Sequence, residues 1–161
     1  MGAQELSALL WRERELLELL TFKLEEEQLL LTAGRTRWVQ HATREVEQVM
    51  ERLRVTGLAR TVEVAQVATE WGTDEGATLR ELVSHAPAGP WAEIFNGHLS
   101  AMTGLTAEIK QLRDVNEQYL RAAVRSTQEA LAGAESEART YDAHGTSELV
   151  GGRAQFFDAR L

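Results

Sequence analysis

The side chains that could carry catalysis or hold a metal ion are few in this sequence, and they are scattered. The four histidines are His41, His85, His98 and His144. None of them lies in Glu-x-x-His or His-Glu-x-x-His, the spacings that place di-iron or zinc ligands on one face of a helix. The chain has no cysteine, which excludes disulfides, thiolate metal sites and a cysteine nucleophile. We therefore expect no metal and no cofactor.

Other motifs of enzyme chemistry are missing as well. The glycines from Gly145 to Gly152 have neither the spacing of a phosphate-binding loop nor a following Lys-Ser/Thr, and Gly-x-Ser-x-Gly does not occur. The run Glu25–Glu27 is more typical of a solvated helix face than of a catalytic carboxylate pair. We expect His41 and His85 at the surface and His98 as a hydrogen-bonded histidine inside a helical bundle. The sequence predicts a protein that is not an enzyme.

The composition indicates helices and an acidic protein. Of 161 residues, 43% are hydrophobic and 26% are charged, and the net charge of −8 argues against nucleic acid as a partner. The arginines between Arg35 and Arg60 spread around a helix, which is more typical of a solvated face than of a nucleic-acid site. No run of about 18 apolar residues occurs, so we expect no stable membrane insertion. The charged N-terminus does not resemble a signal peptide, which favours a cytoplasmic location.

The first long helix is expected at residues 3–33, and its apolar residues repeat at three-, four- and seven-residue steps. Such a stripe is typical of one buried helix face. Glu13 and Glu27 interrupt it, and Gly34 is placed to end the helix. The stripe consists of Leu6, Leu10, Leu17, Leu20, Leu24 and Leu31.

A second long helix is expected at residues 36–71, with Thr36 as its N-terminal cap. Its apolar stripe loosens at Gly57 and then resumes, which favours one continuous helix over two. The first part of the stripe consists of Val39, Ala42, Val46, Val49 and Leu53, and the second of Leu58, Val62, Ala65 and Ala68.

A short helix at 79–85 and a third long helix at 90–139 complete the expected elements. Thr78 and Glu81 have the spacing of a capping box for the short helix, and Pro90 suits the first turn of the long one. The long helix carries two heptad series, Phe95, Met102, Ile109 and Asn116, and His98, Leu105, Leu112 and Tyr119. We predict an all-α fold: an elongated antiparallel three-helix bundle or coiled coil over 1–139, a short extra helix, and a flexible tail at 140–161.

The later part of the third long helix is the candidate site for a protein partner. Its apolar residues exceed what two packed helices need, and an exposed apolar patch marks a partner site. The set consists of Leu112, Tyr119, Leu120, Val124 and Leu131. Asn116 allows two interpretations: an amide that fixes helix register, or a hydrogen-bond donor to an incoming partner.

Four segments, in order, carry a resemblance to a known family. They read LEEEQLL at 24–30, LRELV at 79–83, LRDVN at 112–116 and TYDAHG at 140–145. Their order and spacing over residues 5–146 resemble the FlgN family of bacterial flagellar export chaperones. No one of these short segments is specific by itself.

The resemblance implies a cytosolic chaperone that binds the C-terminal segments of the two hook–filament junction (hook-associated) proteins. It also implies that the chaperone prevents their premature assembly and escorts them to the type III export gate. Asn116 and the apolar set above would then bind the client, and Tyr141 and Gly145 would dock on the gate. A homodimer remains open, as do two other functions, a structural coiled-coil scaffold or oligomerisation module and a secreted helical hairpin of the Trp-x-Gly type.

Overall fold

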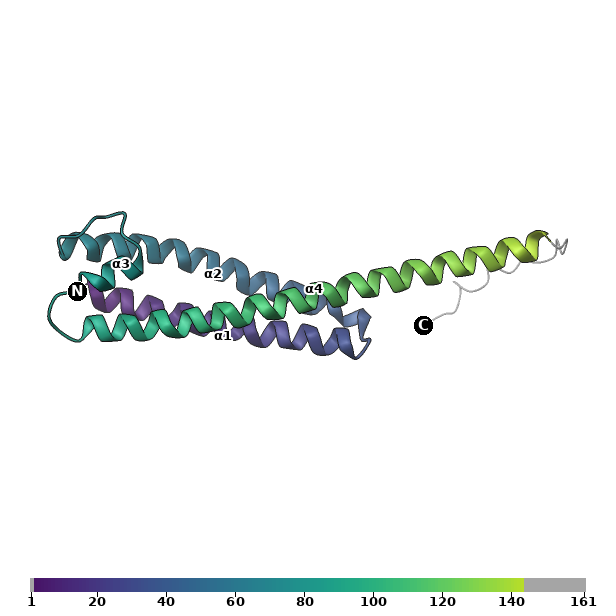
Figure 1. Cartoon of the computed structure of the whole chain (residues 1–161), viewed down its shortest axis with the longest axis horizontal. Coiled ribbons are helices and arrows are strands. Elements are labelled where there is room, and N and C mark those ends of the chain that lie inside the picture. Colours follow the sequence, from purple (N-terminus) through teal and green to yellow (C-terminus); the bar gives the residue numbers. More distant parts are fainter. Residues whose placement is uncertain (1, 144–161) are drawn as a thin grey trace, which may run out of the picture. The chain divides into compact units, whose positions relative to one another are not determined.

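The computed structural model describes residues 2–143 of the chain, and all regular structure in that range is helical (Figure 1). The helices are α1 (Gly2–Thr32), α2 (Thr36–Glu70), α3 (Leu79–Ser84) and α4 (Trp91–Ala143). The all-α prediction is confirmed. The chain divides into two compact units, residues 1–119 and residues 120–161, which are described separately below.

Two glycines end the first two helices in the same way. Gly34 and Gly72 adopt positive φ angles of 67° and 68°. At each helix end, the glycine N–H donates to the carbonyl three residues back and the next N–H donates to the carbonyl five residues back. This is the Schellman arrangement, and only glycine adopts the required backbone conformation without strain. The tight turn at Gly34 makes α2 run antiparallel to α1.

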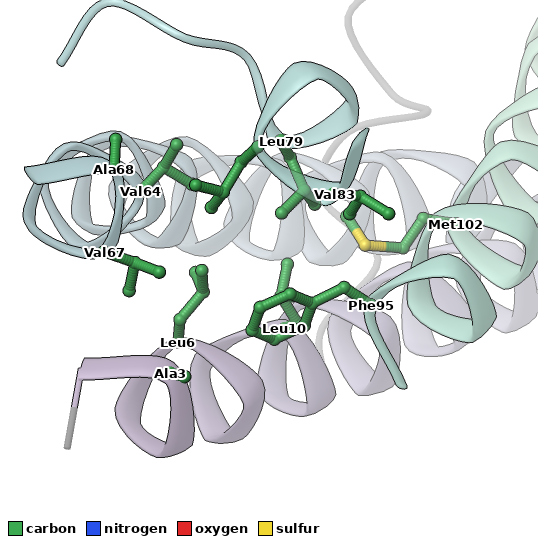
Figure 2. Close-up of a cluster of buried hydrophobic side chains, with 11 residues drawn as sticks. Ala3, Leu6, Leu10, Val64, Val67, Ala68, Leu79, Val83, Phe95 and Met102 are labelled. Atoms are coloured by element: carbon green, nitrogen blue, oxygen red, sulfur yellow. The ribbon is translucent and has the colours of Figure 1, made fainter. Parts of the chain in front are cut away.

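The first unit is a three-helix bundle of α1, α2 and the part of α4 up to residue 119. Leu6 of α1, Val67 of α2 and Phe95 of α4 meet in one apolar cluster, on which Leu79 of α3 also packs (Figure 2). A second cluster joins Leu20 and Leu24 of α1, Val46 and Val49 of α2, and Ile109 of α4. Because Phe95 packs near the start of α1 and Ile109 near its later part, α4 runs parallel to α1 and antiparallel to α2.

The helix α2 continues through Gly57 as expected, but after that glycine its buried face agrees with the prediction only in part, since Ala68 is buried as expected. Leu58 and Val62 are exposed, whereas Thr56, Val64 and Val67 are buried. The buried face keeps its three- and four-residue steps by passing through Thr56 and Arg60. Because Thr56 and Arg60 are polar, a pattern of apolar residues omits them and instead indicates the neighbouring stripe through Leu58 and Val62.

The other helix ends agree with the sequence in part. Thr78 and Glu81 form the expected capping box of α3. The prediction that Thr36 caps α2 is wrong, because the cap position is Arg35 and no side chain caps this end. The helix α4 continues to Ala143, past the expected end at residue 139, so Thr140 and Tyr141 are helical. Residues 144–161 of the expected tail lie outside the described residues.

Candidate protein-binding site

The part of α4 that belongs to the bundle directs its first heptad series inward, together with His98 of the second series. Phe95, His98, Met102, Ile109 and Asn116 are buried. Leu112 is half-buried and packs against the second apolar cluster. This part of α4 therefore already has partners within the chain. It also positions Asn116, the last buried residue of the helix among those that the structure describes.

Asn116 lies in a buried polar layer that connects all three long helices. Its side-chain nitrogen donates to the backbone carbonyl of Leu24 at 2.9 Å and lies 3.3 Å from Oε2 of Glu27. The other carboxylate oxygen of Glu27 accepts a 2.9 Å hydrogen bond from the Thr43 hydroxyl of α2. These contacts favour the register interpretation of Asn116, because the amide protons already have acceptors inside the bundle. The expectation of a solvated face at 25–27 is wrong for Glu27, which is buried.

A second buried carboxylate pairs α1 with α2. Glu13 accepts a 2.9 Å ion-paired hydrogen bond from Nη1 of Arg60. Burial raises the pKa of Glu13, against the opposing effect of the Arg60 guanidinium. In the sequence, Glu13 and Glu27 break the series of leucines. In the structure, both side chains lie on the same buried face of α1 as the leucines, and both are hydrogen-bonded. Both fix the pairing of α2 with α1.

His98 is a buried bundle histidine, as the sequence predicts. Its ring nitrogens lie 3.4 Å from the Ser7 hydroxyl and 3.4 Å from an Arg14 guanidinium nitrogen. The edge of its ring meets the ring of Trp11, with centroids 5.0 Å apart. Burial and, to a lesser extent, the charge of Arg14 lower the pKa of His98. His41 and His85 are exposed, as expected. The part of the chain between residues 2 and 143 contains no group of His, Asp and Glu side chains that could hold a metal ion.

The second unit presents the apolar residues that we predicted to bind a partner. Leu120 is half-buried, while Val124 and Leu131 are 56% and 61% exposed. At 100° per residue these three side chains fall within about 40° of one another around the helix axis. Tyr119, at the end of the first unit, is also exposed. We call Leu120, Val124 and Leu131 the α4 apolar stripe.

The two residues predicted to dock on an export gate lie at or beyond the end of α4. Tyr141 is inside the helix rather than just after it, and its side chain is 67% exposed. Gly145 lies outside the described residues.

The sequence prediction missed an exposed stripe on α1. Trp11, Phe22 and Leu29 are each more than half exposed. They lie on the side of α1 opposite the buried leucines, and their spacing of 11 and 7 residues is helical. The signal was present in the sequence, but the stronger leucine stripe on the other face concealed it.

A helical bundle with exposed apolar helix faces is typical of proteins that bind other proteins. Within residues 2–143, no helix combines the length and hydropathy that a bilayer crossing requires. The family model described as "FlgN protein" matches residues 1–148. The chain therefore belongs to the FlgN family, a family of flagellar export chaperones. Neither a curated protein nor a solved structure matches the chain.

Proposed function

We propose that this chain is a cytoplasmic export chaperone that binds the C-terminal segments of hook-associated junction proteins through the later part of α4. The observation that carries the proposal is the α4 apolar stripe. Val124 and Leu131 are more than half exposed on a helix that has no buried residue from 117 to 141. Family membership supports a chaperone role in flagellar export.

The chemistry of the stripe suits an amphipathic helix as the client. Helices that bind by an apolar face present side chains at i, i+4 and i+7 or i+11, and Leu120, Val124 and Leu131 have this spacing. Small residues such as Ala123 and Ala130 lie between them and let a second helix approach closely. Leu112 and Tyr119, which belong to the first unit, would also contact the client. Asn116 would act indirectly, by holding α4 in register with α1.

Binding of this kind prevents assembly because it covers the client's own apolar face. A client segment that is disordered alone loses conformational entropy when it folds on the chaperone, which keeps the complex reversible. Reversibility is what delivery to the export gate requires. Tyr141 and Gly145 are the proposed gate-docking residues, since an exposed tyrosine offers a large apolar ring and a hydroxyl group.

A calorimetric titration with a matched control variant tests the client site. The full chain is titrated with the C-terminal segment of a junction protein. The double variant Leu120→Asp/Val124→Asp should weaken binding at least tenfold, about 1.4 kcal/mol. The control is Ala122→Asp/Ser126→Asp, which adds the same charge to exposed positions on the opposite side of α4. Equal affinity of both variants for the client would exclude the α4 apolar stripe. An absence of client binding together with oligomer formation would favour a scaffold.

A further inference from the structure

The outer face of α1 carries an acidic and apolar stripe whose side chains are exposed in the described chain. Trp11, Phe22 and Leu29 are 54%, 56% and 70% exposed. Glu15, Glu18 and Glu25 lie between them and are also exposed. Positions 11, 15, 18, 22, 25 and 29 follow the alternating three- and four-residue steps of a coiled-coil seam. We call these six residues the α1 outer stripe.

The glutamates of the α1 outer stripe have no cation of their own in the part of the chain that the structure describes. The carboxylates of α1 that form ion pairs are Glu13, which pairs with Arg60, and Glu26, which pairs with Lys23. Two nearby cations are engaged elsewhere, whereas Arg12, three residues before Glu15, is exposed. Lys23 binds Glu45 at 2.7 Å, and Arg14 lies over the Trp11 ring and beside His98. A partner could therefore supply cations to Glu15, Glu18 and Glu25 without breaking an existing pair.

Trp11 is held in position although half of its surface is exposed. Its ring meets the buried His98 edge-to-face, and the Arg14 guanidinium lies 4.3 Å from the ring centroid. A side chain that is already ordered loses little entropy when a partner covers it. Tryptophan is also among the residues that contribute most to interface affinity. These contacts make Trp11 a suitable anchor.

From this arrangement we infer that the α1 outer stripe binds a cationic amphipathic helix of another protein. Apolar residues of that helix would pack on Trp11, Phe22 and Leu29, and its Lys or Arg side chains would pair with Glu15, Glu18 and Glu25. The helix would lie along α1 as a fourth helix of the bundle. The site lies on a different helix and has different chemistry from the α4 apolar stripe, so the two partners would not compete for the same residues.

A pair of synthetic helices tests the charge requirement. The probe is a three-heptad peptide with Leu at both seam positions and Lys or Arg at the flanking positions, and its control has Glu at the flanking positions. Binding to the full chain is measured by Trp fluorescence and calorimetry. The cationic peptide should bind, with an affinity that falls as salt rises, and the acidic peptide should not. Equal binding of both peptides would overturn the inference.

Two sets of variants then locate the site. Glu15→Gln/Glu18→Gln/Glu25→Gln should weaken the cationic peptide at least tenfold. The control Glu47→Gln/Glu93→Gln/Glu108→Gln removes the same net charge from exposed positions elsewhere and should stay within about twofold. Phe22→Ser/Leu29→Ser should also weaken binding at least tenfold with an unchanged circular-dichroism spectrum. If both glutamate variants lost the same affinity for the cationic peptide, the effect would come from net charge alone. The assignment of the binding site to the α1 outer stripe would then be overturned.

Two further readings separate the alternatives. Sedimentation of the chain alone shows whether a second copy of the chain occupies the α1 outer stripe. A dimer that the Phe22→Ser/Leu29→Ser substitutions dissociate would overturn the assignment of the stripe to a helix of another protein. Binding of the junction-protein segment should be unchanged in all of these α1 variants. This inference therefore stands or fails independently of the client site on α4.

Discussion

The side-chain nitrogen of Asn116 lies 2.9 Å from the backbone carbonyl oxygen of Leu24, and this hydrogen bond joins α4 to α1 inside the core. The same nitrogen lies 3.3 Å from Glu27, which accepts a hydrogen bond from Thr43 of α2. One polar layer thus sets the relative register of three helices. Its position follows directly from the heptad series that also buries Phe95, Met102 and Ile109.

We predict that Asn116→Ala lowers the free energy of unfolding by about 1–3 kcal/mol, because Glu27 then keeps a buried carboxylate oxygen without its donor. Urea unfolding followed by circular dichroism measures the change. The exposed Gln118→Ala, two residues away, should change the free energy by less than about 0.5 kcal/mol. A change as small for Asn116→Ala would show that the polar layer does not hold the helices together.

The Glu13–Arg60 pair should make stability depend on pH at the acid side. Burial raises the pKa of Glu13, so the folded chain keeps this proton at a pH where the unfolded chain has lost it. The stability that this bound proton contributes is present when the pH is below the ordinary carboxyl pKa. It is lost as the pH rises through the raised pKa of Glu13. Glu13→Gln cannot titrate, so its stability relative to the unchanged chain should improve from pH 4 to pH 7. A constant difference across this range would contradict the raised pKa.

The His98 side chain should make stability depend on pH in the opposite direction to Glu13. Burial and Arg14 lower its pKa in the folded chain, so the unfolded chain binds the proton first as the solution is acidified. The associated stability is present above the ordinary histidine pKa of about 6.5 and is lost as pH falls through the lowered value. His98→Gln keeps a hydrogen-bonding group for Ser7 without this titration. Unfolding free energies measured from pH 7.5 to pH 5 should therefore fall more steeply for the unchanged chain than for the variant.

We predict that Tyr141 separates gate docking from client binding. Tyr141→Ala should leave client affinity within about twofold, a change of roughly 0.4 kcal/mol. It should weaken binding of the purified cytosolic gate domain at least tenfold, because it removes a ring that is 67% exposed and free to be buried by a partner. Titration of the gate domain against the preformed chaperone–client complex makes this comparison. Unchanged gate affinity would remove Tyr141 from the docking site.

The helices could be predicted from the sequence because their apolar residues repeat with helical spacing and glycines mark two of their ends. The polar core positions could not be predicted in the same way. Glu13, Glu27 and Thr56 are buried and form hydrogen bonds with partners on other helices or with the helix backbone, and no local apolar pattern shows those partners. The same limitation shifted the expected face of α2 to Leu58 and Val62. Residues 120 and beyond could be proposed as a site only from an excess of apolar residues.

The α1 outer stripe shows a different limitation. Trp11, Phe22 and Leu29 have helical spacing in the sequence, but so do the leucines on the opposite face. Only the packing of α2 and α4 decides which of the two faces is buried. Which face of α1 is exposed can therefore be known from the fold and not from the sequence alone.

Amide hydrogen exchange of the full chain, with and without the C-terminal segment of a junction protein, tests the client site on α4 most directly. Without client, amides in 120–131 should exchange much faster than those of α1, because no buried side chain secures this part of the helix. With client, exchange in 112–131 should slow at least tenfold, while amides along α1 keep their rates. Slowing confined to α1 or α2, with 112–131 unchanged, would contradict the proposal that α4 binds the client.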